Sequence, residues 1–274
     1  MNAVQKIGFI GAGNMATALI SGLIKAGYDH SSIYASSPEK DHLKKLKKEF
    51  SVNVTEYNKE VFLASSIIVL AVKPNVIVNV LEEFSEIISD NECLIISIVA
   101  GLEIKSIQAM IGPERKIIRA MPNTPASLGM GVSALTHNNL INEKDEKEAE
   151  KIFDSVGITC WLEEKFFDLF TALFGSGPAY VFYLIEALQE SAQKIELPDN
   201  LIKNLIIQMI KGSVSLAEGS KDSPSELREK VTSPGGVTER ALEILNERKV
   251  KQHLVEAILE GASRSKHLGG RENG

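Results

Sequence analysis

Short apolar runs alternate with amphipathic stretches from Ile7 to Leu162. The apolar runs are brief and mostly bounded by Gly, Pro, Ser or Asn, which is typical of buried parallel strands. The stretches between them repeat apolar residues at helical spacing. This βαβ alternation predicts a doubly wound sheet with right-handed crossovers. The expected strands are 7–10, 33–35, 67–71, 94–98 and 116–120, and the expected helices start near Met15, cover 42–50 and run from Pro74 towards Ile88.

The pattern changes after Leu162, and from Phe166 onward it predicts helices broken at Pro and Gly, without a strand. The helix expected over 201–217 is apolar on nearly every side, so it has to be buried all round. A helical domain beside a sheet has difficulty burying such a helix alone, and we therefore expect it in the core of a dimer. The expected helices are 178–195, 201–218, 224–230, 237–247 and 249–267, with a disordered tail over 269–274.

Gly11-Ala12-Gly13-Asn14-Met15-Ala16 fits the G-x-G-x-x-A pattern of dinucleotide-binding sites. The pattern directly follows an apolar run and opens an amphipathic stretch, which is the context that supports a nucleotide site. Gly11 allows a tight turn, Gly13 lets the backbone approach a pyrophosphate, and Ala16 keeps the helix close to the strand. The helix start then offers free N–H groups and a positive dipole end to phosphates. The alternative is a tight βα turn without a ligand.

The end of the second expected strand indicates which dinucleotide binds. Sites for NAD usually carry Asp or Glu there, to hold the ribose 2′-hydroxyl. This chain has Ser36 and Ser37 instead, with no carboxylate before Glu39, and Lys40 follows. Two hydroxyls and a cation suit a 2′-phosphate, so we expect NADP, with NADPH preferred and NADH also accepted. The alternative is that the serines only cap the following helix.

Composition and charge narrow the function further. The 274 residues carry a formal net charge of −6, which argues against a nucleic-acid partner, because such binding needs a basic surface. No apolar stretch is long enough to span a bilayer and no leader-like segment precedes Ile7, so we expect a cytoplasmic protein without a membrane partner. Cys93 and Cys160 lie in apolar runs and form no metal-binding cluster, so we expect two reduced core residues and no metal site.

A second glycine-rich turn, Ser233-Pro234-Gly235-Gly236-Val237-Thr238, lies just before a predicted helix. Glycines that free backbone N–H groups at a helix start make a site for an anion. A helix-capping turn without a ligand accounts for the same residues, and composition alone leaves both interpretations open.

Several motifs together resemble the pyrroline-5-carboxylate reductase family. The most specific motif surrounds the second turn and comprises 224–227, 231–238, Leu242 and 245–246. The resemblance extends over residues 6–267, with the motifs in the expected order. The other motifs that resemble the family are 9–13 (FIGAG), 71–74 (AVKP), 121–125 (MPNTP) and 175–180 (GSGPAY).

The resemblance implies an α/β N-terminal Rossmann-type dinucleotide-binding domain over 1–163. It implies an all-α C-terminal domain over 164–274 that dimerises and helps to bind the substrate. The implied reaction is the reduction of 1-pyrroline-5-carboxylate to L-proline with NADPH or NADH, the last step of proline biosynthesis. A homodimer or a larger homo-oligomer, such as a decamer, is implied, with a small molecule as substrate.

Carried over by position, the resemblance also implies the residues of the site. Thr238 is expected to be the catalytic residue, by hydrogen bonding to the ring nitrogen of the imine. We expect the imine's carboxylate on the backbone N–H groups of Gly235, Gly236 and Val237. The substrate-binding set is Ser233, Gly235, Gly236, Val237 and Thr238. The cofactor-binding set is Gly11, Ala12, Gly13, Asn14, Met15, Ser36, Ser37, Asn58, Ala71, Val72, Lys73, Pro74 and Ala100.

Two positions depart from the family pattern. Lys221 stands where relatives commonly carry a glutamate, so either Asp222 provides that substrate contact or the contact is absent. Phe174 stands where a small residue is expected before Gly175, so the packing there is expected to differ.

The chemistry of an imine explains why no obvious catalytic base is found. The ring nitrogen can enter protonated, so the protein mainly orients the reactants, and all five histidines lie outside the motifs. A β-hydroxyacid dehydrogenase using NADP is the first alternative; it needs a base, for which Lys73 is the candidate. A structural or electrostatic role of Lys73 beside the cofactor is favoured. The second alternative is a non-enzymatic nicotinamide-binding sensor, against which the second glycine turn argues.

Overall fold

The structure, a computed structural model, describes residues 5–87 and 93–268. It comprises two compact units: the sheet unit, made of Met1–Ser176 and Glu260–Gly274, and the helical unit, Gly177–Leu259. The predicted tail over 269–274 and the predicted helix end at Ile88 lie outside the described residues. The predicted domain boundary after residue 163 stays a prediction.

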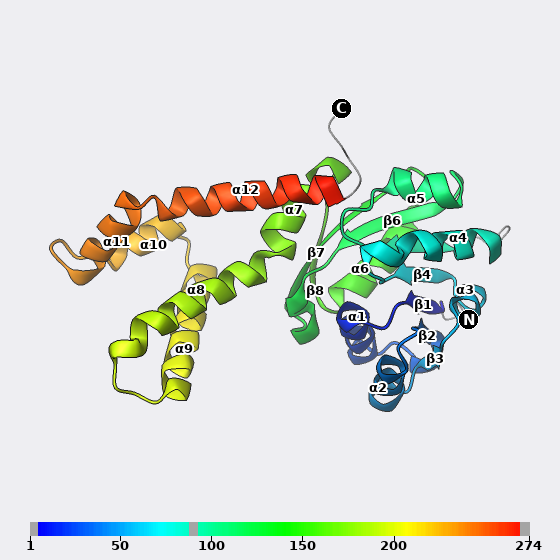
Figure 1. Ribbon diagram of the computed structural model, residues 1–274, viewed down its shortest axis with the longest axis horizontal. Coiled ribbons are helices and arrows are strands. Elements are labelled where there is room, and N and C mark those ends of the chain that lie inside the picture. Colours follow the sequence, from blue (N-terminus) through cyan, green and yellow to red (C-terminus); the bar gives the residue numbers. More distant parts are fainter. Residues whose placement is uncertain (1–4, 88–92, 269–274) are drawn as a thin grey trace. The chain divides into compact units, whose positions relative to one another are not determined.

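An eight-stranded sheet is the centre of the sheet unit, in the order β3-β2-β1-β4-β5-β6-β7-β8 (Figure 1). The strand order turns back at β1, where Ile7 lies beside Ile33 of β2 on one side and Ile67 of β4 on the other. All neighbours are parallel except β6 and β7, which are antiparallel. The strands are β1 Ile7–Ile10, β2 Ile33–Ser36, β3 Asn53–Thr55, β4 Ile67–Leu70, β5 Leu94–Ser97, β6 Lys116–Met121, β7 Gly131–His137 and β8 Gly157–Trp161.

The expected strands are confirmed as β1, β2, β4, β5 and β6, because each is an apolar run that the sheet buries almost completely. Three strands were not expected. β3 has only three residues, whereas β7 and β8 mix apolar residues with small and polar ones. The antiparallel pairing of β7 with β6 is likewise a feature that the apolar pattern did not predict.

Helices cover both faces of the sheet. α1, α2 and α6 pack against one face, and α3, α4 and α5 pack against the other. The three helices expected in this region are confirmed as α1, α2 and α4, and Pro74 opens a short 3₁₀ turn just before α4. The bounds are α1 Asn14–Lys25, α2 Lys40–Phe50, α3 Asn58–Ala64, α4 Ile77–Ile87, α5 Ile104–Ile111 and α6 Glu143–Asp154, with 3₁₀ turns η1 His30–Ser32, η2 Pro74–Val76 and η3 Thr124–Leu128.

The two cysteines differ in burial. Cys93, directly before β5, is buried as expected, and burial raises the pKa of its thiol to about 11. Cys160 is exposed, so the prediction that it lies in the core is wrong. It lies on β8, the edge strand, where side chains alternate between the two faces of the sheet and every second one is exposed. Both thiols are free.

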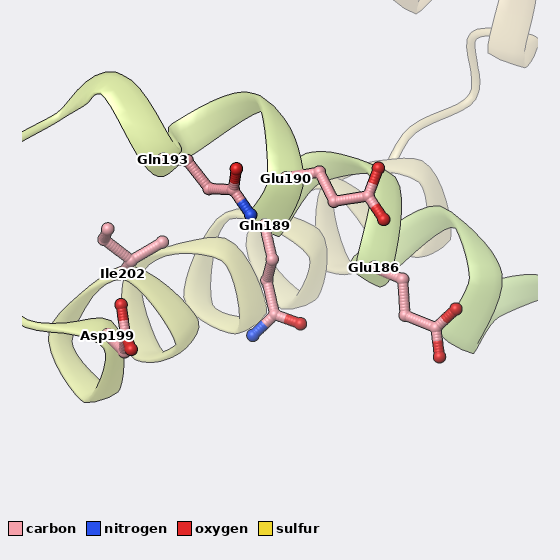
Figure 2. A pocket seen from close by; sticks show the side chains of 6 residues that line it. All are labelled: Glu186, Gln189, Glu190, Gln193, Asp199 and Ile202. Carbon is pink, nitrogen blue, oxygen red and sulfur yellow. The ribbon is translucent and has the colours of Figure 1, made fainter.

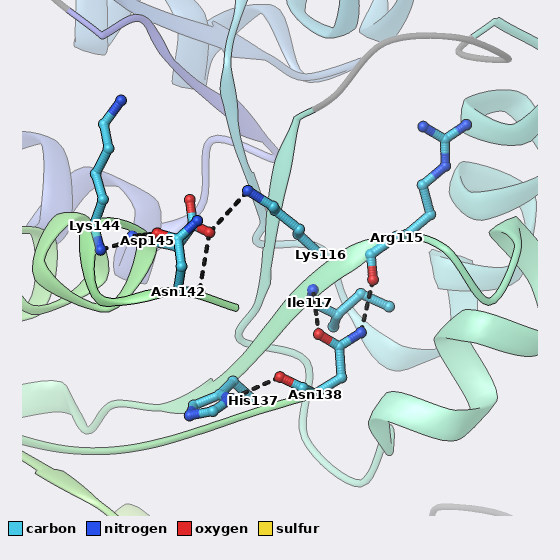
Figure 3. A network of polar contacts seen from close by, with 8 residues as sticks. All are labelled: Arg115, Lys116, Ile117, His137, Asn138, Asn142, Lys144 and Asp145. Carbon is cyan, nitrogen blue, oxygen red and sulfur yellow. Dashed lines mark hydrogen bonds and ion pairs between the residues drawn. The ribbon is translucent and has the colours of Figure 1, made fainter. Parts of the chain in front are cut away.

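A polar network holds the start of β6 to the end of β7 and to α6 (Figure 3). Asn138 donates from Nδ2 to the carbonyl of Arg115 at 2.7 Å and accepts the N–H of Ile117 at 3.3 Å. Lys116 Nζ lies 3.0 Å from Oδ2 of Asp145, in the first turn of α6. These side-chain bonds add to the backbone hydrogen bonds between β6 and β7 and so stabilise their antiparallel register.

The segment 164–176 packs in the sheet unit. Arg119 on β6 is only 2% exposed and pairs with Glu164 at 3.0 Å. Ser265, near the end of α12, donates to Oδ1 of the buried Asp168 at 2.8 Å. These contacts explain why this segment and the last turns of α12 belong to the sheet unit. The elements are η4 Glu164–Phe166, α7 Phe167–Phe170, the π-helical η5 Thr171–Gly175 and α12 Val250–Leu268.

The helical unit contains no strand among its residues, all of which the structure describes, as the sequence predicted. Ile202 is the buried residue of α9, whereas Leu205, Met209 and Leu216 are 53%, 52% and 69% exposed. The apolar faces of α9 are therefore open in the single chain. The helices are α8 Gly177–Ser191, the short η6 Ala192–Lys194, α9 Asp199–Gly219, α10 Pro224–Lys230, α11 Val237–Glu247 and the first part of α12.

A pocket of about 370 Å³ opens beside α8 and α9 (Figure 2). Five of its six lining residues carry a carboxylate or amide group, and Ile202 is the sixth. No group of three His, Cys, Asp or Glu residues suited to a metal ion occurs within residues 5–87 and 93–268. The lining residues are Glu186, Gln189, Glu190, Gln193, Asp199 and Ile202.

The helical run Glu164–Lys194 is long and apolar enough, by length and composition alone, to cross a membrane. This corrects the expectation that no such stretch exists, because successive helical segments join several shorter apolar patches into one run. Only 17% of its most apolar window is buried in the single chain. Its apolar side chains are therefore available to a partner, as those of α9 are.

Candidate cofactor and substrate sites

The first glycine turn joins β1 to α1 where the strand order of the sheet turns back. Gly11 has a φ of +103°, and its N–H donates to the carbonyl of Ser36 at 2.9 Å. A Cβ at Gly11 would lie 2.5 Å from the carbonyl oxygen of Ala71, at the end of β4. Only glycine fits both constraints. The turn thus lies at the carboxyl ends of β1, β2 and β4, the place where doubly wound sheets bind nucleotides.

The start of α1 offers donors for an anion. Gly13 is the N-cap residue, and no side chain caps this helix end. The first N–H groups of a helix have no partner inside it, and the helix dipole favours negative charge there. Ala12 and Ala16 are buried against the sheet, whereas Asn14 is exposed and Met15 is partly exposed. Asn14 and Met15 also line a cavity of about 450 Å³ beside α1.

Ser36 does not lie where the sequence analysis expected it. It is completely buried, and its hydroxyl donates to Oδ1 of Asn58 at 2.7 Å. The expectation that the Ser36 hydroxyl meets a 2′-phosphate is therefore wrong, because the side chain at the last position of this parallel strand points into the protein. Asn58, which opens α3, is partly exposed and stays a candidate for cofactor contact.

The sequence left open whether the residues after β2 bind a 2′-phosphate or only cap the following helix, and Ser37 and Lys40 bear on both roles. Ser37 Oγ accepts the N–H of Glu39, so it stabilises the turn that leads into α2. Ser37 is itself only 5% exposed, so its contact with a cofactor stays a prediction. Lys40 is exposed and lies 3.2 Å from a carboxylate oxygen of Glu56, so a 2′-phosphate would compete with Glu56 for this cation.

The remaining cofactor candidates follow the ends of β4 and β5. Ala71 and Val72 are partly exposed, and Lys73 and Pro74 are exposed. Ala100, beyond β5, is also partly exposed. All of these positions lie on the carboxyl-end side of the parallel strands, as Gly11 does. The structure therefore brings the predicted cofactor residues to one edge of one unit.

The second glycine turn lies in the helical unit and leads into α11. Gly235 has a φ of +71°, which favours glycine, and nothing lies within 4 Å of the position of a Cβ there. Gly236 is the N-cap residue of α11, and no side-chain bond caps that end. Val237 is 90% exposed and Thr238 is exposed. The turn is therefore open to a ligand in the single chain.

The donors of this turn are less free than predicted. The N–H of Gly236 donates to the carbonyl of Ser233 at 2.9 Å, and the N–H of Gly235 donates to Oε2 of Glu239 at 2.7 Å. Both N–H groups are therefore bonded within the turn when no ligand is present, and their contact with a substrate carboxylate stays a prediction. Val237, the first residue of α11, keeps a helix-start N–H for a ligand. Glu239 places its own carboxylate where the ligand's carboxylate was expected.

Asp222 has structural partners of its own. Its carboxylate pairs with Lys230 of α10 and accepts the hydroxyl of Ser220. A carboxylate held in this way has little freedom to replace the glutamate that is absent at Lys221. The substrate role of Asp222 stays a prediction.

Two contacts of the motif regions were not found from the sequence. Asn123, within the MPNTP motif, donates to the carbonyl of Phe174 at 3.0 Å and accepts the N–H of Val132 at 2.9 Å. Phe174 lies against Phe170 with a centroid distance of 4.7 Å, which is how the larger side chain is accommodated. An acidic residue three positions after an N-cap, as Glu239 is, was a recognisable capping signal.

Comparison with known proteins assigns the N-terminal and the C-terminal part of the chain to two different family models. Residues 164–268 match the family described as pyrroline-5-carboxylate reductase dimerisation. Residues 6–101 match the family described as NADP oxidoreductase, coenzyme F420-dependent. A pyrroline-5-carboxylate reductase of Pseudomonas aeruginosa is 36% identical over 267 residues, which are 97% of each chain.

Solved structures agree with the same family. A pyrroline-5-carboxylate reductase from Coxiella burnetii has a TM-score of 0.88 and 36% identity, covering 97% of this chain and 98% of that chain. A pyrroline carboxylate reductase from Plasmodium falciparum, solved with NADP bound, has a TM-score of 0.88 and 35% identity over the same shares. The predicted fold class, a Rossmann-type domain followed by a helical dimerisation domain, is confirmed.

Proposed function

The chain belongs to the pyrroline-5-carboxylate reductase family, and on that premise we propose that it reduces 1-pyrroline-5-carboxylate to L-proline with a nicotinamide cofactor. The observation that carries the proposal is 36% identity over 97% of both chains, in a chain that keeps the glycine turn at β1 and the glycine turn at α11. The product places the enzyme at the last step of proline biosynthesis. A β-hydroxyacid dehydrogenase is not favoured.

The cofactor half of the mechanism rests on the sheet unit. The start of α1 binds the pyrophosphate through its free N–H groups and its dipole, without help from a capping side chain. The cofactor lies along the ends of β4 and β5, next to Ala71, Val72, Lys73, Pro74 and Ala100. The bound nicotinamide supplies the hydride. The reduction of a protonated imine needs no base, so Lys73 is not required as one. Its role is to contribute positive charge beside the phosphates.

The substrate half rests on the turn before α11. The helix-start N–H of Val237 and the positive end of the α11 dipole attract the imine's carboxylate. Binding of that carboxylate displaces Glu239 from the N–H of Gly235 and so recovers a second donor. The hydroxyl of Thr238 accepts the iminium N–H and holds the ring nitrogen in place during the transfer. Orientation, rather than proton transfer, is the main contribution of these residues.

The protein assembles as a homo-oligomer through its dimerisation domain. The exposed apolar side chains of α8 and α9 are the surface that a second copy covers, and the same pairing explains why the helical run Glu164–Lys194 is so apolar. A larger assembly of dimers, such as a decamer, extends this proposal. Burial of these faces between soluble copies favours a cytoplasmic enzyme over a membrane-bound one.

NADPH is the proposed preferred cofactor, with NADH also accepted. No carboxylate ends β2, and the exposed Lys40 that follows offers a cation to a 2′-phosphate. Ser37→Asp is expected to shift the preference towards NADH. Ser36→Asp and, to a lesser degree, Ser37→Asp would also bury a carboxylate and destabilise the fold, since the two residues are 0% and 5% exposed.

A spectrophotometric assay tests the proposed function. Purified protein is mixed with 1-pyrroline-5-carboxylate and NADPH, and oxidation of the cofactor is followed together with the formation of proline. Proline formation with a higher kcat/KM for NADPH than for NADH is expected. A protein that binds NADPH but forms no proline would contradict the proposal.

A further inference from the structure

A chain of hydrogen bonds links three elements at the cofactor edge of the sheet. The hydroxyl of Ser36 on β2 donates to Oδ1 of Asn58, the first residue of α3, at 2.7 Å. Asn58 Nδ2 in turn donates to Oε2 of Glu83 on α4 at 2.8 Å. Ser36 is fully buried, whereas Asn58 and Glu83 are partly exposed. This series of hydrogen bonds therefore leads from the core of the protein to its surface, with Asn58 in the middle.

Glu83 is the member of this chain that decides the orientation of the amide. A serine hydroxyl can donate or accept, so Ser36 alone is compatible with either face of the Asn58 amide. An ionised carboxylate only accepts, so Glu83 requires Nδ2 on its own side. With Nδ2 facing Glu83, Oδ1 faces Ser36, and Ser36 must be the donor. One hydrogen of Nδ2 is used by Glu83, and the other remains available.

The position of Asn58 indicates what the remaining N–H meets. Asn58 lies beside the end of β2, where sites of this fold hold the ribose that carries the 2′ substituent. Its partner Ser36 is the last residue of β2, and the N–H of Gly11, in the pyrophosphate turn, is bonded to the Ser36 carbonyl. A donor at this place favours an oxygen acceptor such as a 2′-phosphate. An amide turned the other way would offer an acceptor there, which a phosphate repels.

We propose that Glu83 is a positioning residue for cofactor specificity: it holds the Asn58 amide with its donor towards the cofactor and so favours NADPH. The inference rests on the proposed cofactor site, and it adds a residue that lies on α4, away from the glycine turn. Glu83 has a second effect, because its negative charge by itself disfavours a phosphate nearby. The two effects have opposite signs, so the substitution of Glu83 separates them.

The test measures cofactor binding directly, with the full-length protein and without the imine. Glu83→Gln replaces the acceptor-only group by an amide that accepts either face of Asn58. We expect the dissociation constant of NADPH, followed by nucleotide fluorescence, to rise about tenfold, the effect of one hydrogen bond to a charged group. The constant for NADH should change less. Glu82→Gln removes the same charge from an exposed neighbour on α4 and should change neither constant.

A double-mutant cycle ties the effect to Asn58. In an Asn58→Ala background, Glu83→Gln should cause no further loss of NADPH binding, because the group that it orients is gone. The melting temperature of each variant separates misfolding from mispositioning, and Glu83→Asp, which keeps an acceptor-only carboxylate, should retain most of the NADPH preference if Glu83→Gln proves unstable. With saturating NADPH, kcat for the imine should stay unchanged while KM for NADPH rises.

Three results would overturn the inference: tighter NADPH binding by Glu83→Gln, an effect equal to that of Glu82→Gln, or an additive loss in the Asn58→Ala background. Tighter binding would mean that Glu83 acts only as a repelling charge. Failure of the proposed function is distinguishable, since wild-type protein would then form no proline while NADPH binding still depended on Glu83.

Discussion

Helices α1 and α9 are both rich in apolar residues, yet they differ in where those residues lie. In α1 the buried residues include Leu19, Ile20 and Leu23, which pack on the sheet of the same chain. In α9 Ile202 is buried, and most of the other apolar side chains are open. The sheet unit therefore buries the apolar face of α1 within one chain, whereas the helical unit leaves most apolar side chains of α9 exposed, as the proposed dimer requires.

The difference has an energetic consequence. Burial of one large aliphatic side chain stabilises a protein by about 1.5–3 kcal/mol, so several exposed ones represent a large unused driving force for association. An interface of this kind resembles a domain core divided between two chains. The sheet unit should then tolerate disruption of the dimer, while the helical unit should not.

The largest expected effect is loss of the dimer on Leu205→Lys. The substitution places a charge in the apolar face of α9, where a second copy is expected to bury it without a partner. Sedimentation should show monomers or aggregates in place of dimers, with loss of helical signal. Gln208→Lys puts the same charge on the polar side of the same helix, at an exposed position, and should leave the dimer intact. A dimeric, active Leu205→Lys protein would contradict the comparison.

The next effect concerns the sheet unit alone. Gly11→Ala should destabilise the fold by about 2–4 kcal/mol, because its Cβ meets the Ala71 carbonyl at 2.5 Å and the φ of +103° strains any other residue. Gly13→Ala is the matched control, since nothing lies within 4 Å of its Cβ position. It should keep the melting temperature but weaken NADPH binding. Equal melting temperatures of the two variants would refute this account of the turn.

Thr238→Ala tests the turn before α11. Loss of a charge-assisted hydrogen bond to the ring nitrogen should lower kcat/KM for the imine by about tenfold to a hundredfold. The dissociation constant of NADPH should stay nearly unchanged, because the predicted cofactor residues all lie in the sheet unit. Thr232→Ala is a useful control: its hydroxyl donates to the carbonyl of Arg228, so its loss affects stability. Wild-type kcat/KM with a lowered melting temperature would refute the catalytic role of Thr238.

Glu239→Gln should have a smaller and opposite effect. The Glu239 carboxylate competes with the imine's carboxylate for the N–H of Gly235, and a neutral amide competes less. KM for the imine should fall by about threefold, and the melting temperature should drop slightly, because an acidic residue near the start of α11 stabilises the helix. An increase in KM would instead indicate that Glu239 holds the turn in its binding conformation.

A last effect, confined to alkaline pH, reports on the core of the sheet unit. Burial raises the pKa of the Cys93 thiol to about 11 from 9.0, so the folded chain holds this proton more tightly than the unfolded chain. The resulting stability is fully present below pH 9 and is lost as the pH rises through about 11, an effect of about 1–3 kcal/mol. Denaturant unfolding should show this decline for wild type and for Cys160→Ala, and a smaller decline for Cys93→Ala.

Local sequence predicted the elements well wherever a pattern was satisfied by near neighbours. The buried strands β1 and β4 are continuous apolar runs, and α11 begins at Val237, directly after its two glycines. β7 and β8 were missed because their mixed composition is stabilised by distant partners, among them the contacts of Asn138. Cys160 was misplaced for the same reason: an apolar run at a sheet edge has one exposed side, and only the strand order shows which strand is the edge.

The sequence by itself determined the class of the fold, the two glycine turns and the large apolar surface of α9, because each depends on local geometry or on the number of apolar residues. The tertiary structure alone decided the state of individual polar groups. It turned Ser36 inwards to Asn58 and set Glu83 beside that amide. A hydrogen bond tolerates deviations of only a few tenths of an ångström in the distance between donor and acceptor. Between residues far apart in the chain, that distance is set only when the protein folds.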